Sequence, residues 1–155
     1  MKHKGFDLEE GLEIQVNLIH DILSLLEGYK KKYPQYEKLL NDDRANTSRQ
    51  LIRKTSIMIS DISDTNLKSE GVRNNPKEEF YTEHLIPVNQ IAKSIEKDFS
   101  IQNIKEELMK SKVAILTVTE HNLYEGKDAP QKGIYGIKHR TPEQIEKFTK
   151  DFKLL

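Results

Sequence analysis

A regular run of apolar residues near the start of the chain constrains its fold more than any other feature. These residues recur at alternating intervals of four and three positions, which is the period of one helix face. They are Leu12, Val16, Ile19, Leu23 and Leu26. A second apolar set widens the same face, namely Ile14, Leu18, Ile22 and Leu25. The pattern predicts a helix over residues 7–27.

This first helix has recognisable ends and needs a covering surface. Asp7 is a residue type that caps helix starts, and Gly28 stands where a helix usually stops. A face this wide must be covered by other apolar groups. Two interpretations stay open: the following helices cover it as a bundle core, or a second copy of the chain packs on residues 8–26. The bundle core is the favoured interpretation, and the heptad-like intervals are the argument for the second copy.

The rest of the N-terminal half is predicted to be helical and to end in a polar segment. Pro34 interrupts the pattern, a short helix is expected over residues 36–40, and a longer one over residues 44–62. Four basic residues lie along the longer helix, and a solvated face is expected for them rather than the alternative, a contact with phosphate: Arg44, Arg49, Arg53 and Lys54. Residues 63–77 are polar and rich in turn formers, which predicts a long loop.

The C-terminal half mixes short strands with helices. Residues 113–118 form a continuous apolar, mostly β-branched run, which predicts a buried strand. Residues 81–86 are expected to be extended, and residues 133–137 are a candidate to pair with the buried strand. The expected helices cover residues 87–99, 101–111 and 141–154, and a further short helix opens at Thr119.

These patterns together predict the fold class. The chain is expected to be an α+β protein that is predominantly α-helical. Residues 1–62 form a helical hairpin or bundle region, residues 63–77 a linker loop, and residues 78–155 a mixed region with two or three short strands.

The composition excludes several classes of protein and site. The chain has 155 residues, no cysteine, and equal numbers of basic and acidic residues, so its formal net charge is zero. The lack of cysteine removes disulfides, thiolate nucleophiles and cysteine-based zinc sites. Zero net charge argues against a strongly basic nucleic-acid binder. No apolar run approaches the ~20 residues that span a bilayer, and no signal peptide is evident, so a cytoplasmic protein without a membrane partner is expected.

Two short segments carry residues suited to catalysis. The first is Glu83-His84-Leu85-Ile86-Pro87, at the end of an extended segment. The second ends in Thr119-Glu120-His121, where the apolar strand enters a helix. Together they resemble the signature of the HNH, or ββα-metal (His-Me finger), nuclease superfamily. In that signature an acidic residue and a histidine precede a hydrophobic pair and proline, and a later helix carries the last metal ligand.

The resemblance implies a nuclease that hydrolyses phosphodiesters with one divalent metal ion, Mg²⁺, Mn²⁺ or Zn²⁺. Glu83 and His121 would hold the metal, which neutralises charge on the leaving oxygen. His84 would act as the general base on water. Nucleic acid would then be the partner, and Lys138 and Arg140 of a small basic cluster would contact its phosphates.

The chain also departs from the family pattern. The family places an asparagine about nine residues before the last histidine, whereas Lys112 stands here and cannot accept an imidazole N–H. Residues 88–111 are expected to be helical rather than a hairpin. These departures leave open a divergent nuclease or a degenerate relative that has lost catalysis. The alternative is a non-catalytic helical protein that oligomerises and binds another protein.

Overall fold

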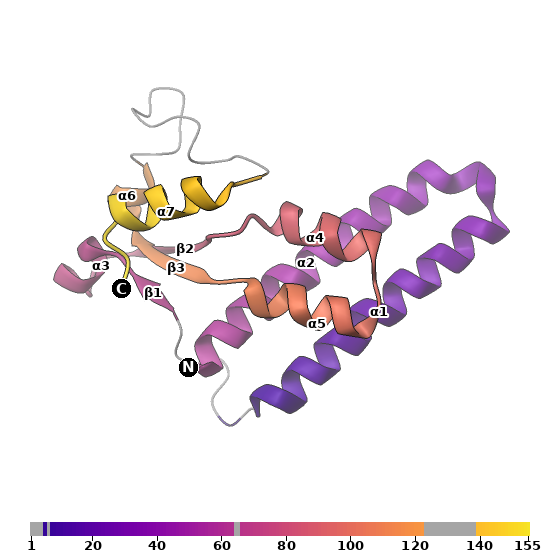
Figure 1. Ribbon diagram of the computed structural model, residues 1–155, viewed down its shortest axis with the longest axis horizontal. Coiled ribbons are helices and arrows are strands. Elements are labelled where there is room, and N and C mark those ends of the chain that lie inside the picture. The colour runs from indigo at the N-terminus through magenta and orange to yellow at the C-terminus, as the bar shows by residue number, and fades with distance from the viewer. Residues whose placement is uncertain (1–4, 6, 64–65, 123–138) are drawn as a thin grey trace.

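The computed structural model describes residues 5, 7–63, 66–122 and 139–155. It confirms a predominantly helical α+β protein, with a long helical hairpin at one end and a small sheet at the other (Figure 1). The elements are α1 (Leu8–Lys32), η1 (Pro34–Tyr36), α2 (Glu37–Ser63), β1 (Leu67–Lys68), α3 (Glu70–Asn74), β2 (Phe80–His84), α4 (Val88–Lys97), α5 (Ile101–Lys110), β3 (Val113–Thr117), α6 (Val118–Asn122) and α7 (Pro142–Asp151). None of the described helices combines the length and the apolar character needed to cross a bilayer.

The hairpin of α1 and α2 is the longest feature of the molecule (Figure 1). Asp7 caps α1, since its Oδ1 accepts a hydrogen bond from the Glu10 amide at 2.9 Å. The helix ends in three lysines, whose charge is favourable at a helix C-terminus. Pro34 opens the 3₁₀ turn η1. α2 then runs unbroken over residues 37–63, where two helices are expected, because no proline or glycine interrupts this stretch.

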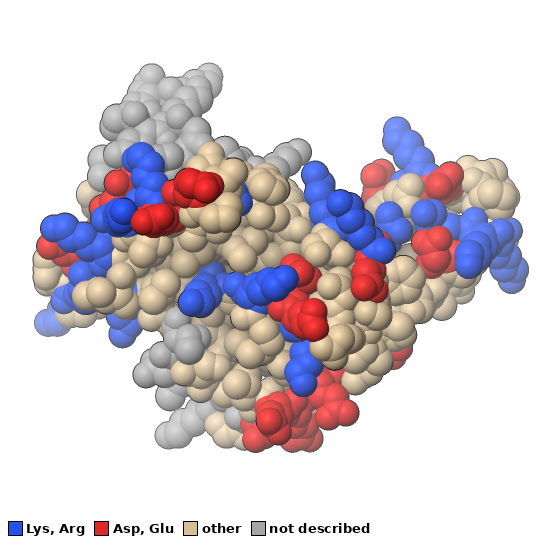
Figure 2. All heavy atoms as spheres, in the orientation of Figure 1, with Lys and Arg blue, Asp and Glu red and all other residues tan. Residues whose placement is uncertain are grey.

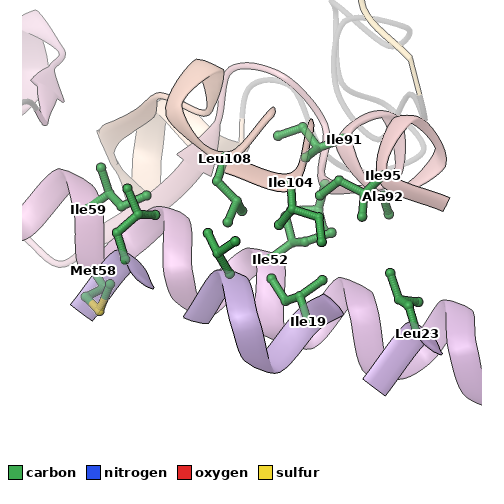
Figure 3. Close-up of a cluster of buried hydrophobic side chains, with 13 residues drawn as sticks. Ile19, Leu23, Ile52, Met58, Ile59, Ile91, Ala92, Ile95, Ile104 and Leu108 are labelled. Carbon is green, nitrogen blue, oxygen red and sulfur yellow. The ribbon is translucent and has the colours of Figure 1, made fainter. Parts of the chain in front are cut away.

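The first apolar face of α1 is buried inside its own chain. Figure 3 shows Ile19 and Leu23 of α1 against Ile52 of α2, with side chains of α4 and α5 closing the cluster from the other side. The buried members of this core are Leu12, Val16, Ile19, Leu23, Ile52, Met58, Ile59, Val88, Ile91, Ala92, Ile95, Ile104 and Leu108. Three helices, α2, α4 and α5, therefore cover the face that the heptad-like intervals could have offered to a second copy.

The sheet has three strands in the order β1-β3-β2. β2 runs antiparallel to β3, from Phe80 opposite Thr117 to His84 opposite Val113. β1 pairs in parallel with β3, with Leu67 opposite Ala114. The sequence predicts a loop over residues 63–77, but the structure has β1 and the short helix α3 there. A strand of two residues and a helix of five are too short to produce a periodic pattern in the sequence. The strand expected over residues 133–137 lies outside the described residues.

α7 covers one face of the sheet. Its predicted capping box is present: the Thr141 hydroxyl accepts from the Gln144 amide, and the Gln144 side chain accepts from the Thr141 amide. The apolar residues of this second core are Leu85, Ala114, Leu116, Phe148, Phe152 and Leu154. The opposite face of the sheet is turned toward α2, so the two faces have different surroundings.

We expect two isoleucines of α1 to respond very differently to truncation. Ile19 is fully buried in the four-helix core, so Ile19→Ala should lower the free energy of unfolding by about 2–5 kcal/mol. Ile14 is 56% exposed on the same helix, and Ile14→Ala should change the free energy of unfolding of the monomeric chain by less than about 0.5 kcal/mol. Urea unfolding followed by circular dichroism measures both. Equal losses would contradict the assignment of the buried face.

Candidate functional site

The two sequence segments that resemble the nuclease signature lie on neighbouring strands. The first begins with the last two residues of β2, and the second is the passage from β3 into α6. The ring of Tyr81 in β2 stacks on the imidazole of His121 in α6, with ring centroids 3.9 Å apart and planes 12° from parallel. His121 therefore lies beside the start of β2, whereas Glu83 and His84 stand at the end of this strand, opposite the start of β3.

Strand alternation places Glu83 and His84 on opposite faces of the sheet. Successive side chains of a strand point to opposite faces, and residues directly opposite on neighbouring strands share a face. Glu83 lies opposite Ala114, which belongs to the core under α7. His84 lies opposite Val113, on the face turned toward α2. The acidic residue and the histidine are adjacent in sequence but face different environments.

Arg140 is the partner of Glu83. Its Nη2 lies 3.1 Å from Glu83 Oε1, and its Nη1 donates to the carbonyl oxygens of His84 at 2.8 Å and Leu85 at 3.2 Å. The guanidinium also lies over the ring of Phe148, 5.0 Å from its centroid. Arg140 is only 2% exposed, and its guanidinium contacts the chain's own backbone. The phosphate contact that the sequence predicts for Arg140 is therefore not available in this arrangement. Lys138, the other predicted phosphate ligand, lies outside the described residues.

The predicted metal ligands do not fit a shared metal ion in this arrangement. Glu83 faces a guanidinium, His121 is stacked on Tyr81, and His84 points to the other side of the sheet. Among the described residues, no three histidine or carboxylate side chains are grouped closely enough to hold a metal. We therefore assign no chemical step to a metal.

Glu120, between Thr119 and His121 in the second motif, has a structural role. Its carboxylate accepts hydrogen bonds from the Ser69 hydroxyl and from the Thr117 amide at 2.9 Å. Gly71 in α3 has no side chain to hinder it, since a Cβ there would come within 2.6 Å of a Glu120 oxygen. Glu120 thereby fastens the start of α3 to the end of β3. Lys112, where the nuclease family has asparagine, contributes its backbone carbonyl to the Leu85 amide at 3.0 Å.

His84 is the titratable group with the most perturbed environment in the described part of the chain. It is 9% exposed, and its Nε2 is buried without a hydrogen-bond partner. Burial, followed by the positive charge of Arg53, lowers its pKa from 6.5 to about 4. A hydrogen bond with the backbone of Arg53 opposes this change, and the charge of Arg140 adds to it. The imidazole is therefore neutral near pH 7.

A hollow of about 280 Å³ opens beside His84. It is lined by Arg53, Thr82, Glu83, His84, Pro87, Val88 and Asn89. Arg53 brings an exposed cation from α2, and Pro87 to Asn89 form the first turn of α4. The sequence contains no direct signal for Arg53, because it is one of four basic residues along a helix for which a solvated face is expected.

The start of α4 adds a second feature suited to an anion. No side chain caps this helix, and its Ncap residue Pro87 has no side-chain acceptor to offer. The backbone amides of a helix N-terminus carry partial positive charge and bind anions well. The hollow therefore combines an uncapped helix start, a guanidinium and a neutral imidazole.

Comparison with known proteins leaves the site to be interpreted from its geometry, because no family model, curated protein or solved structure matches this chain. The view in Figure 2 shows acidic and basic side chains interspersed over the surface, with acidic groups gathered near the start of α1. On this face no extended basic surface marks a nucleic-acid groove among the residues that the structure describes.

The lowered pKa of His84 has a consequence for stability. Between pH 4 and 6.5 the unfolded chain binds a proton that the folded chain excludes, so the free energy of unfolding should rise with pH across this window. The contribution is complete above pH 6.5, is lost as pH falls toward 4, and reaches roughly 3 kcal/mol. Urea unfolding at several pH values measures it. His84→Gln should flatten this slope, whereas His139→Gln at an exposed position should not. Identical slopes in all three proteins would contradict the buried neutral state of His84.

Proposed function

We propose that this chain is a phosphodiester hydrolase that uses His84 of the nuclease-like motif as its general base without the motif's metal ligands, with its substrate phosphate bound in the hollow beside His84. The observation that carries the proposal is the buried, neutral imidazole of His84 with an unpartnered Nε2, next to Arg53. A buried polar atom without a partner costs about 1–3 kcal/mol, and the position of this one beside Arg53 and an open hollow favours a functional explanation. An unprotonated imidazole nitrogen is a proton acceptor.

The residues that line the hollow have different roles in the proposed hydrolysis. The guanidinium of Arg53 and the amides at the start of α4 bind the non-bridging oxygens and stabilise the charge that develops on them. His84 accepts a proton from the attacking water through Nε2. A new P–O bond forms to the water oxygen, one ester P–O bond breaks, and the leaving alkoxide takes a proton from solvent. The products are a phosphate monoester and an alcohol.

Substrate binding would also raise the pKa of His84. Part of the depression of the His84 pKa comes from the charge of Arg53. A phosphodiester anion paired with Arg53 offsets that charge, so the pKa of His84 rises on binding. The imidazole thereby becomes a better proton acceptor when a substrate is present, because base efficiency increases as the pKa approaches the working pH.

Hydrolysis of bis(p-nitrophenyl) phosphate near pH 7.5 tests this function directly. His84→Gln should lower kcat at least about a hundredfold, because general-base catalysis contributes factors of 10²–10⁴. Arg53→Ala should lower kcat/KM at least about tenfold through the lost phosphate contact. Lys54→Ala removes a neighbouring exposed cation that does not line the hollow, and is the matched control.

Assays with EDTA, and with added Mg²⁺, Mn²⁺ or Zn²⁺, test the metal requirement that the resemblance predicts. No hydrolysis by the unmodified chain under any of these conditions would overturn the proposal. Full activity of His84→Gln would overturn it equally, because the general base would then lie elsewhere.

A second candidate function is self-association through α1, and one observation favours it. Three of the four members of the second apolar set of this helix are exposed in the described structure: Ile14, Leu18 and Leu25 are 56%, 40% and 60% exposed. They lie along one side of the helix, flanked by the carboxylates of Glu13 and Asp21. Contiguous exposed apolar groups of this kind mark association sites.

Light scattering coupled to size-exclusion chromatography tests this association. The unmodified chain should be dimeric at micromolar concentration, and Leu18→Glu should be monomeric, because a charge at the centre of the stripe opposes its burial. Lys93→Glu on the exposed surface of α4 serves as the control and should leave the dimer intact. A monomeric unmodified chain would remove this candidate.

A further inference from the structure

A second hollow lies beside the first along the same strand. It has a volume of about 580 Å³ and is lined by Asp61, Asn66, Lys68, Val72, Arg73, Pro76, Phe80 and Ile115. Asp61 is on α2, two helical turns beyond Arg53, and Phe80 is at the start of β2. Phe80, Thr82 and His84 alternate onto the same face of the sheet, opposite Thr117, Ile115 and Val113. We name the surface between α2 and this face of β2 the β2–α2 groove.

The floor of the second hollow is aromatic and apolar. Phe80 is 60% exposed although it belongs to a paired strand, and Val72, Pro76 and Ile115 surround it. Strand spacing puts the Cα atoms of Phe80 and His84 ~13 Å apart. At this distance, a single nucleic-acid strand can place a base on Phe80 and a phosphate of a nearby nucleotide beside His84.

The cations of the groove have no ion-pair partner among the residues that the structure describes. Arg53, Lys68 and Arg73 line it, and the described part of the chain gives none of them an ion-pair partner. Arg73 is held in place by its Nη1, which donates to the carbonyls of Lys68 and Lys153. Of the two carboxylates, Glu83 is paired with Arg140 and Asp61 accepts from the Asn66 amide at 3.0 Å. In a chain with zero net charge, this is a local positive lining.

We propose that the β2–α2 groove binds single-stranded nucleic acid, with a base stacked on Phe80 and the adjoining phosphodiester in the hollow beside His84. This inference rests on the proposed function, because it names the substrate class of the same site. An exposed aromatic ring beside cations is the arrangement that binds unpaired bases and their backbone. A duplex is excluded, because its bases are paired and stacked and present no free face to Phe80.

Binding of fluorescein-labelled oligothymidylate and oligouridylate, followed by fluorescence anisotropy, tests the inference separately from hydrolysis. Phe80→Ala should weaken binding at least about tenfold, since stacking on an aromatic side chain contributes at this level. An oligonucleotide of the same length with abasic sites should bind the unmodified chain equally weakly. Tyr36→Ala, at an exposed aromatic residue in η1, is the matched control and should bind as the unmodified chain does.

Phe80→Trp provides an independent signal. The chain contains no tryptophan, so this variant carries a single reporter, and its fluorescence should be quenched when a base stacks on it. Equal affinity of Phe80→Ala and the unmodified chain, undiminished binding of the abasic strand, or equal binding of a duplex would each overturn the inference. Binding that depends on Phe80 without any hydrolysis of bis(p-nitrophenyl) phosphate would support the groove and overturn only the catalytic proposal.

Discussion

The buried guanidinium of Arg140 is the interaction on which the arrangement of the site depends. At the corner between β2 and α4, the chain leaves its strand pairing and presents the carbonyls of His84 and Leu85 to the interior. Arg140 satisfies both and is balanced by Glu83, while Gln90 of α4 bonds its backbone. A buried charge without such partners would be costly, so these contacts hold one another in place. They fix the corner from which His84 projects.

This corner determines what His84 can do. Because Glu83 is held on the α7 side by Arg140, strand alternation turns His84 toward α2 and the side chain of Arg53. Burial there keeps the imidazole neutral, and both guanidiniums favour the same state. Glu83 and His84 are adjacent in the sequence but have different surroundings. Glu83 forms the ion pair with the buried Arg140, and His84 lies beside the open hollow.

The sequence predicts the parts of this fold that depend on local patterns. The seam through Ile19 and Leu23, the capping box at Thr141 and the apolar run of β3 each carry a periodic or positional signal. It does not predict β1, whose two residues pair through backbone groups, nor the ion pair between Arg140 and Glu83, whose partners are 57 positions apart. Arg53 is not singled out from the other basic residues of its helix for the same reason: its place beside His84 follows from the packing of α2 against the sheet, which no spacing along the chain records.

The unsatisfied groups around the hollow distinguish a binding site from a structural corner. A corner selected for stability alone would gain from an Asp or Ser cap at the start of α4 and from a partner for His84 Nε2, since each contributes about 1 kcal/mol. Here Pro87 occupies the Ncap position, Nε2 has no partner among the described residues, and Arg53 has no counter-ion there. Under the proposed function, one anion that brings a proton donor, such as a phosphodiester with its attacking water, would compensate these three features together. The hollow would then be costly for the free chain and favourable for the complex.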